Sequence, residues 1–95
     1  MIISTVKYRS RTDIIVNMLE AARHGGTKTK IMYSSYLSSH QLRAYLELVI
    51  RNGLLVYDST KQRYRTTEKG LRLLEVYNNI SKLELAASAW TMPQK

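Results

Sequence analysis

The sequence predicts a mainly α-helical fold with one small β-hairpin and a long final helix. Three observations lead to this fold class. Residues 28–52 have the pattern of a short helix, a polar turn and a longer amphipathic helix. Two short β-prone runs follow at 54–58 and 63–66, separated by polar residues that suit a turn. Residues 71–92 contain no helix breaker, so we expect one continuous helix that reaches Pro93.

The composition indicates a single basic domain with a polyanionic partner. At 95 residues the chain can build one modest core. Its net charge of +8 points to nucleic acid or an anionic membrane surface. Residues 1–66 hold eleven Lys and Arg against four acidic residues, a net +7, whereas residues 67–95 hold four against three, a net +1. The first two thirds of the chain therefore carries the charge that a polyanion would meet.

Cysteine content and hydropathy limit the kinds of site and the cellular location that we expect. The chain has no Cys, which excludes disulfides and thiolate metal sites. No run approaches the roughly eighteen apolar residues of a membrane span, and the apolar start at residues 1–6 is too short for a signal peptide. We therefore expect a soluble cytoplasmic protein without a membrane partner.

The N-terminal third predicts an arm and a first helix. Residues 1–10 combine β-prone apolar residues with a basic cluster, which suits an arm or an added edge strand; a partly ordered terminus is the alternative. The helix begins after Ser10 or Thr12 as its cap, with Asp13 in the first turn, and ends at residues 25–26, both Gly. Its expected buried stripe consists of Ile14, Ile15, Met18, Leu19 and Ala22.

Residues 28–52 have the pattern of a helix-turn-helix. Ser38 and Gln41 form a capping box that starts the second helix, and Gly53 supplies the left-handed residue that ends it. The buried stripe of this helix is expected to consist of Leu42, Tyr45, Leu46 and Val49. Its opposite face carries Ser39, His40, Arg43, Ala44, Glu47 and Arg51. Small polar and basic residues at the start of such a helix suit entry into a DNA major groove.

The two β-prone runs predict a hairpin with its turn at residues 59–62. One face of the hairpin would carry Leu55, Tyr57, Tyr64 and Thr66. The other face would carry Arg63 and Arg65. Three helices followed by a hairpin is the winged-helix arrangement, in which the hairpin is the wing.

The final helix predicts a homodimer. It is expected to begin after Thr67 as its cap, with Glu68 in its first turn. A heptad-like seam follows, spaced alternately three and four residues apart, and consists of Leu73, Val76, Ile80, Leu83, Ala87 and Trp90. A helix of about 23 residues extends roughly 35 Å, longer than a small domain can cover. We therefore expect the part beyond Tyr77 to pair with a second copy. The expected divisions of the chain are an arm at 1–10, a winged helix-turn-helix domain at 11–66 and a dimerisation helix at 67–92.

Several of these segments together resemble a known family. They are RSRTDII at 9–15, TKTKIMY at 27–33 followed by Leu37-Ser38, the stretch 45–54, and Tyr64 with TEKG at 67–70. The chain resembles the small archaeal winged-helix proteins over about Arg9 to Tyr77. That family includes chromatin-associated members that dimerise through a long C-terminal helix in an antiparallel coiled coil. The resemblance implies a DNA-binding dimer. The chain departs from the family in its apolar start, where members often have a basic tail, and in its short seam, which leaves the direction of the coiled-coil strands open.

The candidate DNA contacts divide into two kinds. Lys28, Lys30, Lys61 and Arg63 suit phosphates, whereas Ser39, His40, Gln41 and Arg43 are placed to reach base edges. Arg65 on the wing and Tyr36 in the turn complete the set. Taken singly, each charge is more often part of a solvated surface than a contact, and the capping box would occupy Gln41. The other tyrosines do not indicate single-strand stacking, because Tyr33, Tyr45, Tyr57 and Tyr64 fall at positions expected to pack.

The sequence offers little for catalysis. His24 and His40 are the two histidines, and neither has a carboxylate at metal-ligand spacing. There is no Gly-rich phosphate loop, and the carboxylates are scattered over separate elements. We expect no enzyme activity, no cofactor, no metal and no small-molecule substrate.

Two functions from different classes follow. The first is a homodimeric winged-helix protein that binds double-stranded DNA, as a transcriptional regulator or a nucleoid-associated chromatin protein. The alternative is a winged-helix interaction module that docks an acidic partner and assembles a complex through its coiled coil. The concentration of charge on the helix-turn-helix and wing favours the first.

Overall fold

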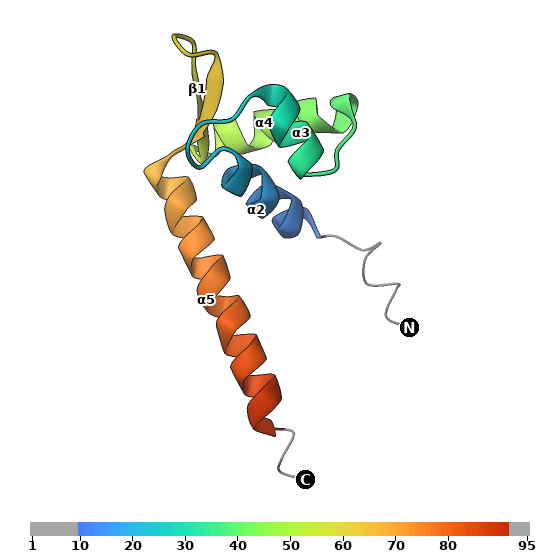
Figure 1. Cartoon of the computed structure of the whole chain (residues 1–95), viewed down its shortest axis with the longest axis vertical. Coiled ribbons are helices and arrows are strands. Elements are labelled where there is room, and N and C mark those ends of the chain that lie inside the picture. Colours follow the sequence, from blue (N-terminus) through green and yellow to red (C-terminus); the bar gives the residue numbers. More distant parts are fainter. Residues whose placement is uncertain (1–9, 92–95) are drawn as a thin grey trace.

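The computed structural model describes residues 10–91, with side chains for residues 10–83. The N-terminal arm expected at 1–10 therefore lies outside the described residues, apart from Ser10. The elements in chain order are α2 (Arg11–Ala21), α3 (Lys28–Ser34), α4 (Ser39–Arg51), β1 (Leu55–Asp58), β2 (Arg63–Thr66) and α5 (Glu68–Thr91). Helices α2, α3 and α4 gather into a head with the hairpin at one edge, and α5 extends away from it (Figure 1).

Side-chain caps start the first three helices. Ser10 caps α2: its hydroxyl accepts from the Asp13 backbone N–H at 3.0 Å, and the Asp13 carboxylate accepts from the Ser10 N–H at 3.2 Å. The box predicted for α4 is confirmed, since the Ser38 hydroxyl accepts from the Gln41 N–H at 3.1 Å and Gln41 Oε1 accepts from the Ser38 N–H at 3.0 Å. Thr27 caps α3 with a single bond, in which its hydroxyl accepts from the Lys30 backbone N–H at 3.1 Å. These bonds satisfy backbone N–H groups that no helical carbonyl can reach.

One hydrophobic core holds the head together. Its fully buried large side chains come from every element except β2 and are Met18, Leu19, Ile31, Leu42, Val49, Leu55 and Leu74. The stripe predicted for α4 is confirmed, with Leu42, Leu46 and Val49 buried and Tyr45 packed against them. Because this stripe is buried, the opposite face of α4 is turned toward the solvent.

The hairpin has the predicted register and gains a third partner. Leu55 pairs with Thr66 and Tyr57 with Tyr64, so these four side chains share one face, as expected. The backbones of Gly26 and Tyr64 also exchange two hydrogen bonds of 2.8 Å, which joins the turn after α2 to β2. A side chain at Gly26 would lie 2.8 Å from the Ala21 carbonyl oxygen, so this close approach requires glycine.

Helix α5 has two different apolar faces. Leu74 is fully buried against the head and Tyr77 packs beside it. The predicted seam lies roughly a third of a turn away around the helix. Its members Val76, Ile80 and Leu83 are exposed, Leu83 by 68%. The 24 residues of α5 extend about 36 Å, far beyond the head (Figure 1).

One residue of the predicted seam has contacts within its own chain. Leu73 packs against the core of its own chain, so it does not belong wholly to a free surface. Heptad spacing alone could not distinguish the side of α5 that packs on the head from the side that stays exposed. The side chains of Ala87 and Trp90 lie outside the described ones.

Two tyrosines expected to pack are exposed. Tyr33 is 69% exposed, because the seven-residue α3 buries only Ile31 fully. Tyr57 shares the hairpin face of Leu55 but is half exposed. Its ring contacts that of Tyr64, with a centroid distance of 4.8 Å. Tyr45 and Tyr64 pack against the core as predicted.

Candidate nucleic-acid interface

The outward face of α4 is polar and accessible over its first half. Ser39, His40 and Arg43 are all exposed. Arg43 forms no ion pair with any residue in the described part of the chain, whereas Arg51, two turns later, pairs with Glu47 at 2.8 Å. A guanidinium with no internal partner keeps all of its donors available to a ligand.

Gln41 is partly committed to the helix cap. Its Oε1 accepts the Ser38 backbone N–H, so the side chain is held against the start of α4. The amide nitrogen still has two N–H donors. The structure therefore places Gln41 at the predicted surface with its acceptor already in use.

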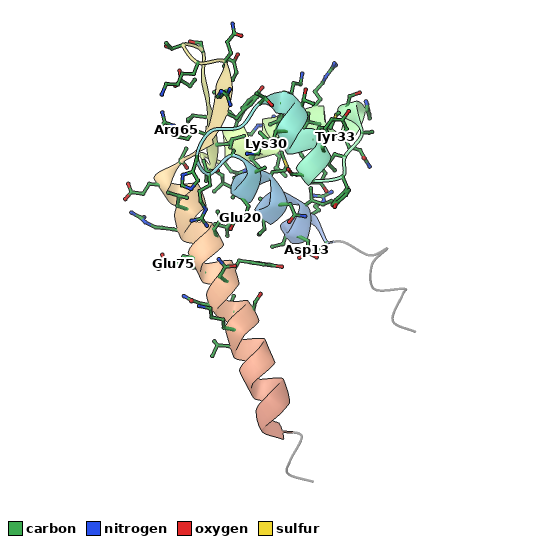
Figure 2. All side chains as sticks on the ribbon, in the orientation of Figure 1. Asp13, Glu20, Lys30, Tyr33, Arg65 and Glu75 are labelled. Atoms are coloured by element: carbon green, nitrogen blue, oxygen red, sulfur yellow. The ribbon has the colours of Figure 1, made fainter. Side chains whose placement is uncertain are left out.

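Helix α3 and the turn after it present two cations and two aromatic rings. Lys28 and Lys30 are exposed on α3, where Lys30 and Tyr33 project from the head (Figure 2). Tyr36 is 79% exposed. Its φ of 54° lies in the left-handed region, which residues other than Gly, Asn and Asp rarely adopt. The turn is held by backbone bonds from Tyr36 N to Tyr33 O at 3.2 Å and from Leu37 N to Met32 O at 3.1 Å. Tyr33 was expected to pack in the core, but its exposure makes it a candidate DNA contact.

The wing places Lys61 on a turn organised by Asp58, and Arg63 and Arg65 on strand β2. Its Oδ1 accepts from the backbone N–H groups of Thr60 at 3.0 Å and Lys61 at 3.3 Å. Its Oδ2 lies 3.8 Å from Arg65, which is exposed on β2 (Figure 2). Lys61 and Arg63 are also exposed. The one carboxylate of the wing therefore shapes the turn that carries Lys61 and also lies close to Arg65.

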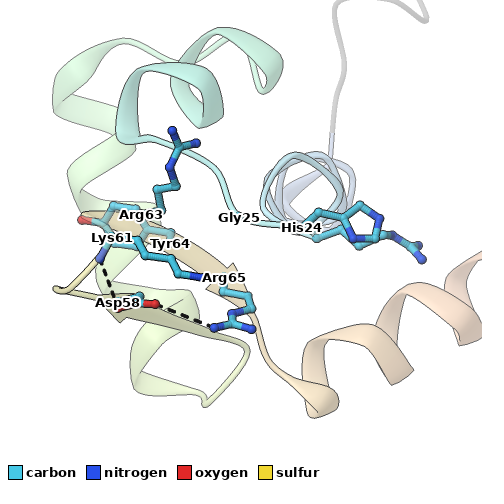
Figure 3. Close-up of a pocket in the computed structure, with 8 residues that line it drawn as sticks. His24, Gly25, Asp58, Lys61, Arg63, Tyr64 and Arg65 are labelled. Atoms are coloured by element: carbon cyan, nitrogen blue, oxygen red, sulfur yellow. Dashed lines mark hydrogen bonds and ion pairs between the residues drawn. The ribbon is translucent and has the colours of Figure 1, made fainter.

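A cleft opens between the wing and the turn after α2, with a volume of about 290 Å³ (Figure 3). Its charged and polar lining consists of Arg23, His24, Asp58, Lys61, Arg63 and Arg65. Burial raises the pKa of Tyr64, which also lines the cleft, and neighbouring Tyr57 raises it further. Tyr64 therefore adds no negative charge at neutral pH.

The structure places all the predicted DNA-contact residues at the surface and groups two further residues with the wing. All ten predicted DNA-contact residues are exposed, on α3, the turn, α4 and the wing. Arg23 and His24 were not among them, although they share the cleft with three predicted wing residues. The paired glycines at 25–26, interpreted only as a helix end, were the available signal.

Within residues 10–83 no three His, Asp or Glu side chains gather as metal ligands would. None of the described helices is both long and apolar enough to cross a bilayer.

The comparisons with known proteins agree with this architecture. The sequence pattern of the family described as "Winged helix-turn-helix" matches residues 8–85. A search of curated protein sequences finds no match. The chain is similar in structure to Sso10a-2 of Sulfolobus solfataricus, with a TM-score of 0.63 and 20% sequence identity, over 87% of this chain and 97% of that one. At this identity the likeness shows a shared fold.

Proposed function

We propose that this chain, which belongs to the winged helix-turn-helix family, binds double-stranded DNA as a homodimer, with α4 in the major groove and the wing along the backbone. The observation that carries the proposal is the exposed first half of α4, where Arg43 has no ionic partner in the described part of the chain. The crystal structure of Sso10a-2, which has the same fold, is described as that of a DNA-binding protein, and this supports the assignment.

The roles divide between affinity and discrimination. Lys28, Lys30, Lys61, Arg63 and Arg65 contact phosphates, which give affinity and salt dependence without sequence information. Ser39, His40 and Arg43 face the base edges, with the Gln41 amide as a further donor. Tyr36 contacts the sugar-phosphate backbone from the turn.

The dimer forms through the seam of α5. Val76, Ile80 and Leu83 expose apolar side chains on a helix that has left the head. A second α5 covers these side chains, and each copy then presents one α4 to the duplex. In this form the protein acts as a transcriptional regulator or a nucleoid-associated architectural protein in the cytoplasm, and base preference separates those two roles.

A duplex titration tests the proposal. Labelled duplex DNA of about 20 base pairs should bind with a dissociation constant well below 10⁻⁴ M at physiological salt, and the affinity should fall steeply as salt rises. A poly-glutamate peptide of equal charge serves as the matched competitor. Binding to the peptide with no duplex binding below about 10⁻⁴ M would contradict the proposal and favour docking of an acidic protein partner.

A further inference from the structure

The cleft beside the wing is assembled from segments far apart in the sequence. Arg23 and His24 come from the turn after α2, whereas Lys61, Arg63 and Arg65 come from the wing (Figure 3). The Gly26 to Tyr64 backbone bonds hold these segments together. The cations therefore share a cleft because the fold brings them there, not because they are neighbours in sequence.

The charge of the lining favours an anion. Four cationic side chains line the cleft, and Arg23 among them also forms an ion pair of 3.0 Å with Glu20. When Glu20 and Asp58, the one carboxylate of the lining, are both counted and His24 is taken as neutral, an excess of two positive charges remains. That carboxylate, Asp58, already lies 3.8 Å from Arg65 and accepts two backbone N–H groups. Concave sites lined by one sign of charge concentrate counter-ions, because the low-dielectric walls focus the field.

Gly25, one of the residues that line the cleft, contributes no side chain to it. Gly25 has φ 96°, a conformation that side chains rarely adopt, so a replacement there would be strained. The volume of about 290 Å³ lies at the small end of ligand pockets, which suits a compact group and not a drug-sized ligand.

We propose that this cleft is a phosphate site, in which Arg23 and His24 act together with the wing cations that the proposed function already assigns to phosphates. The inference rests on the proposed function for the source of the phosphate, which is the backbone of the bound duplex. A free diphosphate has the same chemistry and is the second possible source. Arg23 and His24 then extend the DNA contact surface to the turn after α2.

Inorganic pyrophosphate is the probe for the site itself. Titrated into the ¹⁵N-labelled full chain, it should shift the amides of His24, Gly25 and Lys61 in a saturable way. The amides of Asn78 and Asn79, exposed on α5, should not follow. A linear drift without saturation, or equal shifts on α5, would overturn the proposal.

Two charge changes of opposite sign sharpen the test. Arg23→Gln should weaken pyrophosphate binding at least about threefold, because a charge-assisted contact is lost. Asp58→Asn should tighten it, because the amide oxygen can still accept the two wing-turn N–H groups while the repelling charge is gone. Arg72→Gln is the matched control, since Arg72 is exposed and lies 3.8 Å from Glu68 on α5, as Arg65 does from Asp58. If Arg72→Gln weakens binding as much as Arg23→Gln, or if Asp58→Asn weakens it, the cleft is not the site.

Competition identifies the source. Displacement of pyrophosphate by duplex DNA would assign the site to a backbone phosphate. A duplex that binds while pyrophosphate stays in place would assign the site to a free diphosphate. It would also contradict the wing's contact with DNA phosphates, while α4 would remain the proposed DNA-binding helix. Saturable pyrophosphate binding without any duplex binding would remove the proposed function and keep the anion site. Displacement by poly-glutamate but not by duplex would overturn the phosphate assignment.

Discussion

The hydroxyl of Tyr77 donates a hydrogen bond of 2.9 Å to Oδ1 of Asp13. The other carboxylate oxygen of Asp13 accepts the Ser10 N–H in the capping box of α2. One carboxylate thus connects the start of α2 to α5 at the point where α5 leaves the head. In the proposed dimer this bond sets the direction of the free part of α5, and with it the spacing between the two α4 helices.

Tyr77→Phe should destabilise the head without removing its packing. The variant keeps the ring and loses a hydrogen bond to a charged acceptor, so the free energy of unfolding should fall by about 1 to 2 kcal/mol. Urea denaturation at fixed protein concentration measures the change. Tyr33→Phe is the control, because its ring is exposed. Equal stabilities of the two variants would mean that the bond does not fix α5.

Leu83→Glu should convert the dimer to a monomer of 11.0 kDa, because it places a charge in the seam. Truncation after Tyr77 should have the same effect, since it removes the exposed apolar part of α5. Asn78→Glu adds the same charge on roughly the opposite side of α5 and should leave the dimer intact. Light scattering at micromolar concentration distinguishes these states. A wild-type protein that is monomeric under these conditions would refute the dimer.

Lys61→Ala and Arg63→Ala should weaken binding to all duplexes alike. Each lost phosphate contact should reduce the slope of log affinity against log salt by about 0.9 on B-DNA. Lys82→Ala removes an exposed charge from α5 and should leave the slope unchanged. If the wing variants retain the wild-type slope, the wing lies away from the DNA.

Arg43→Lys tests whether the protein discriminates between sequences. Lysine keeps the charge but lacks the planar fork that pairs with guanine O6 and N7, a pairing worth about 1 to 3 kcal/mol against the wrong base. In a specific regulator the variant should lose preference for its best site and keep its non-specific affinity. In an architectural protein it should match the wild type on every sequence. Equal loss on all sequences would show that Arg43 contacts only phosphate.

Features set by local chemistry could be predicted from the sequence. The Ser38 and Gln41 box depends on residues three apart, and the α4 stripe depends on helical spacing, so neither needs a distant partner. The face shared by Tyr57 and Tyr64 followed from strand alternation and turn length.

Features set by tertiary contacts could not be predicted in this way. Leu74 was missed because heptad spacing selects Leu73, while contact with the head decides which side of α5 is buried. The cleft was missed because Arg23 and Arg65 are brought together only when Gly26 pairs with Tyr64. The glycines at 25–26 were the local signal, but they do not indicate which strand would pair with them.

The central claim is that α4 is the helix that binds DNA, and charge reversal tests it most directly. Arg43→Glu and Arg72→Glu change the net charge equally, on α4 and on α5. Fluorescence anisotropy with one labelled duplex should show affinity reduced at least about tenfold for Arg43→Glu and within about twofold of wild type for Arg72→Glu, since only Arg43 meets the duplex. Equal losses for the two variants would show that binding follows overall charge, and would contradict the assignment of α4.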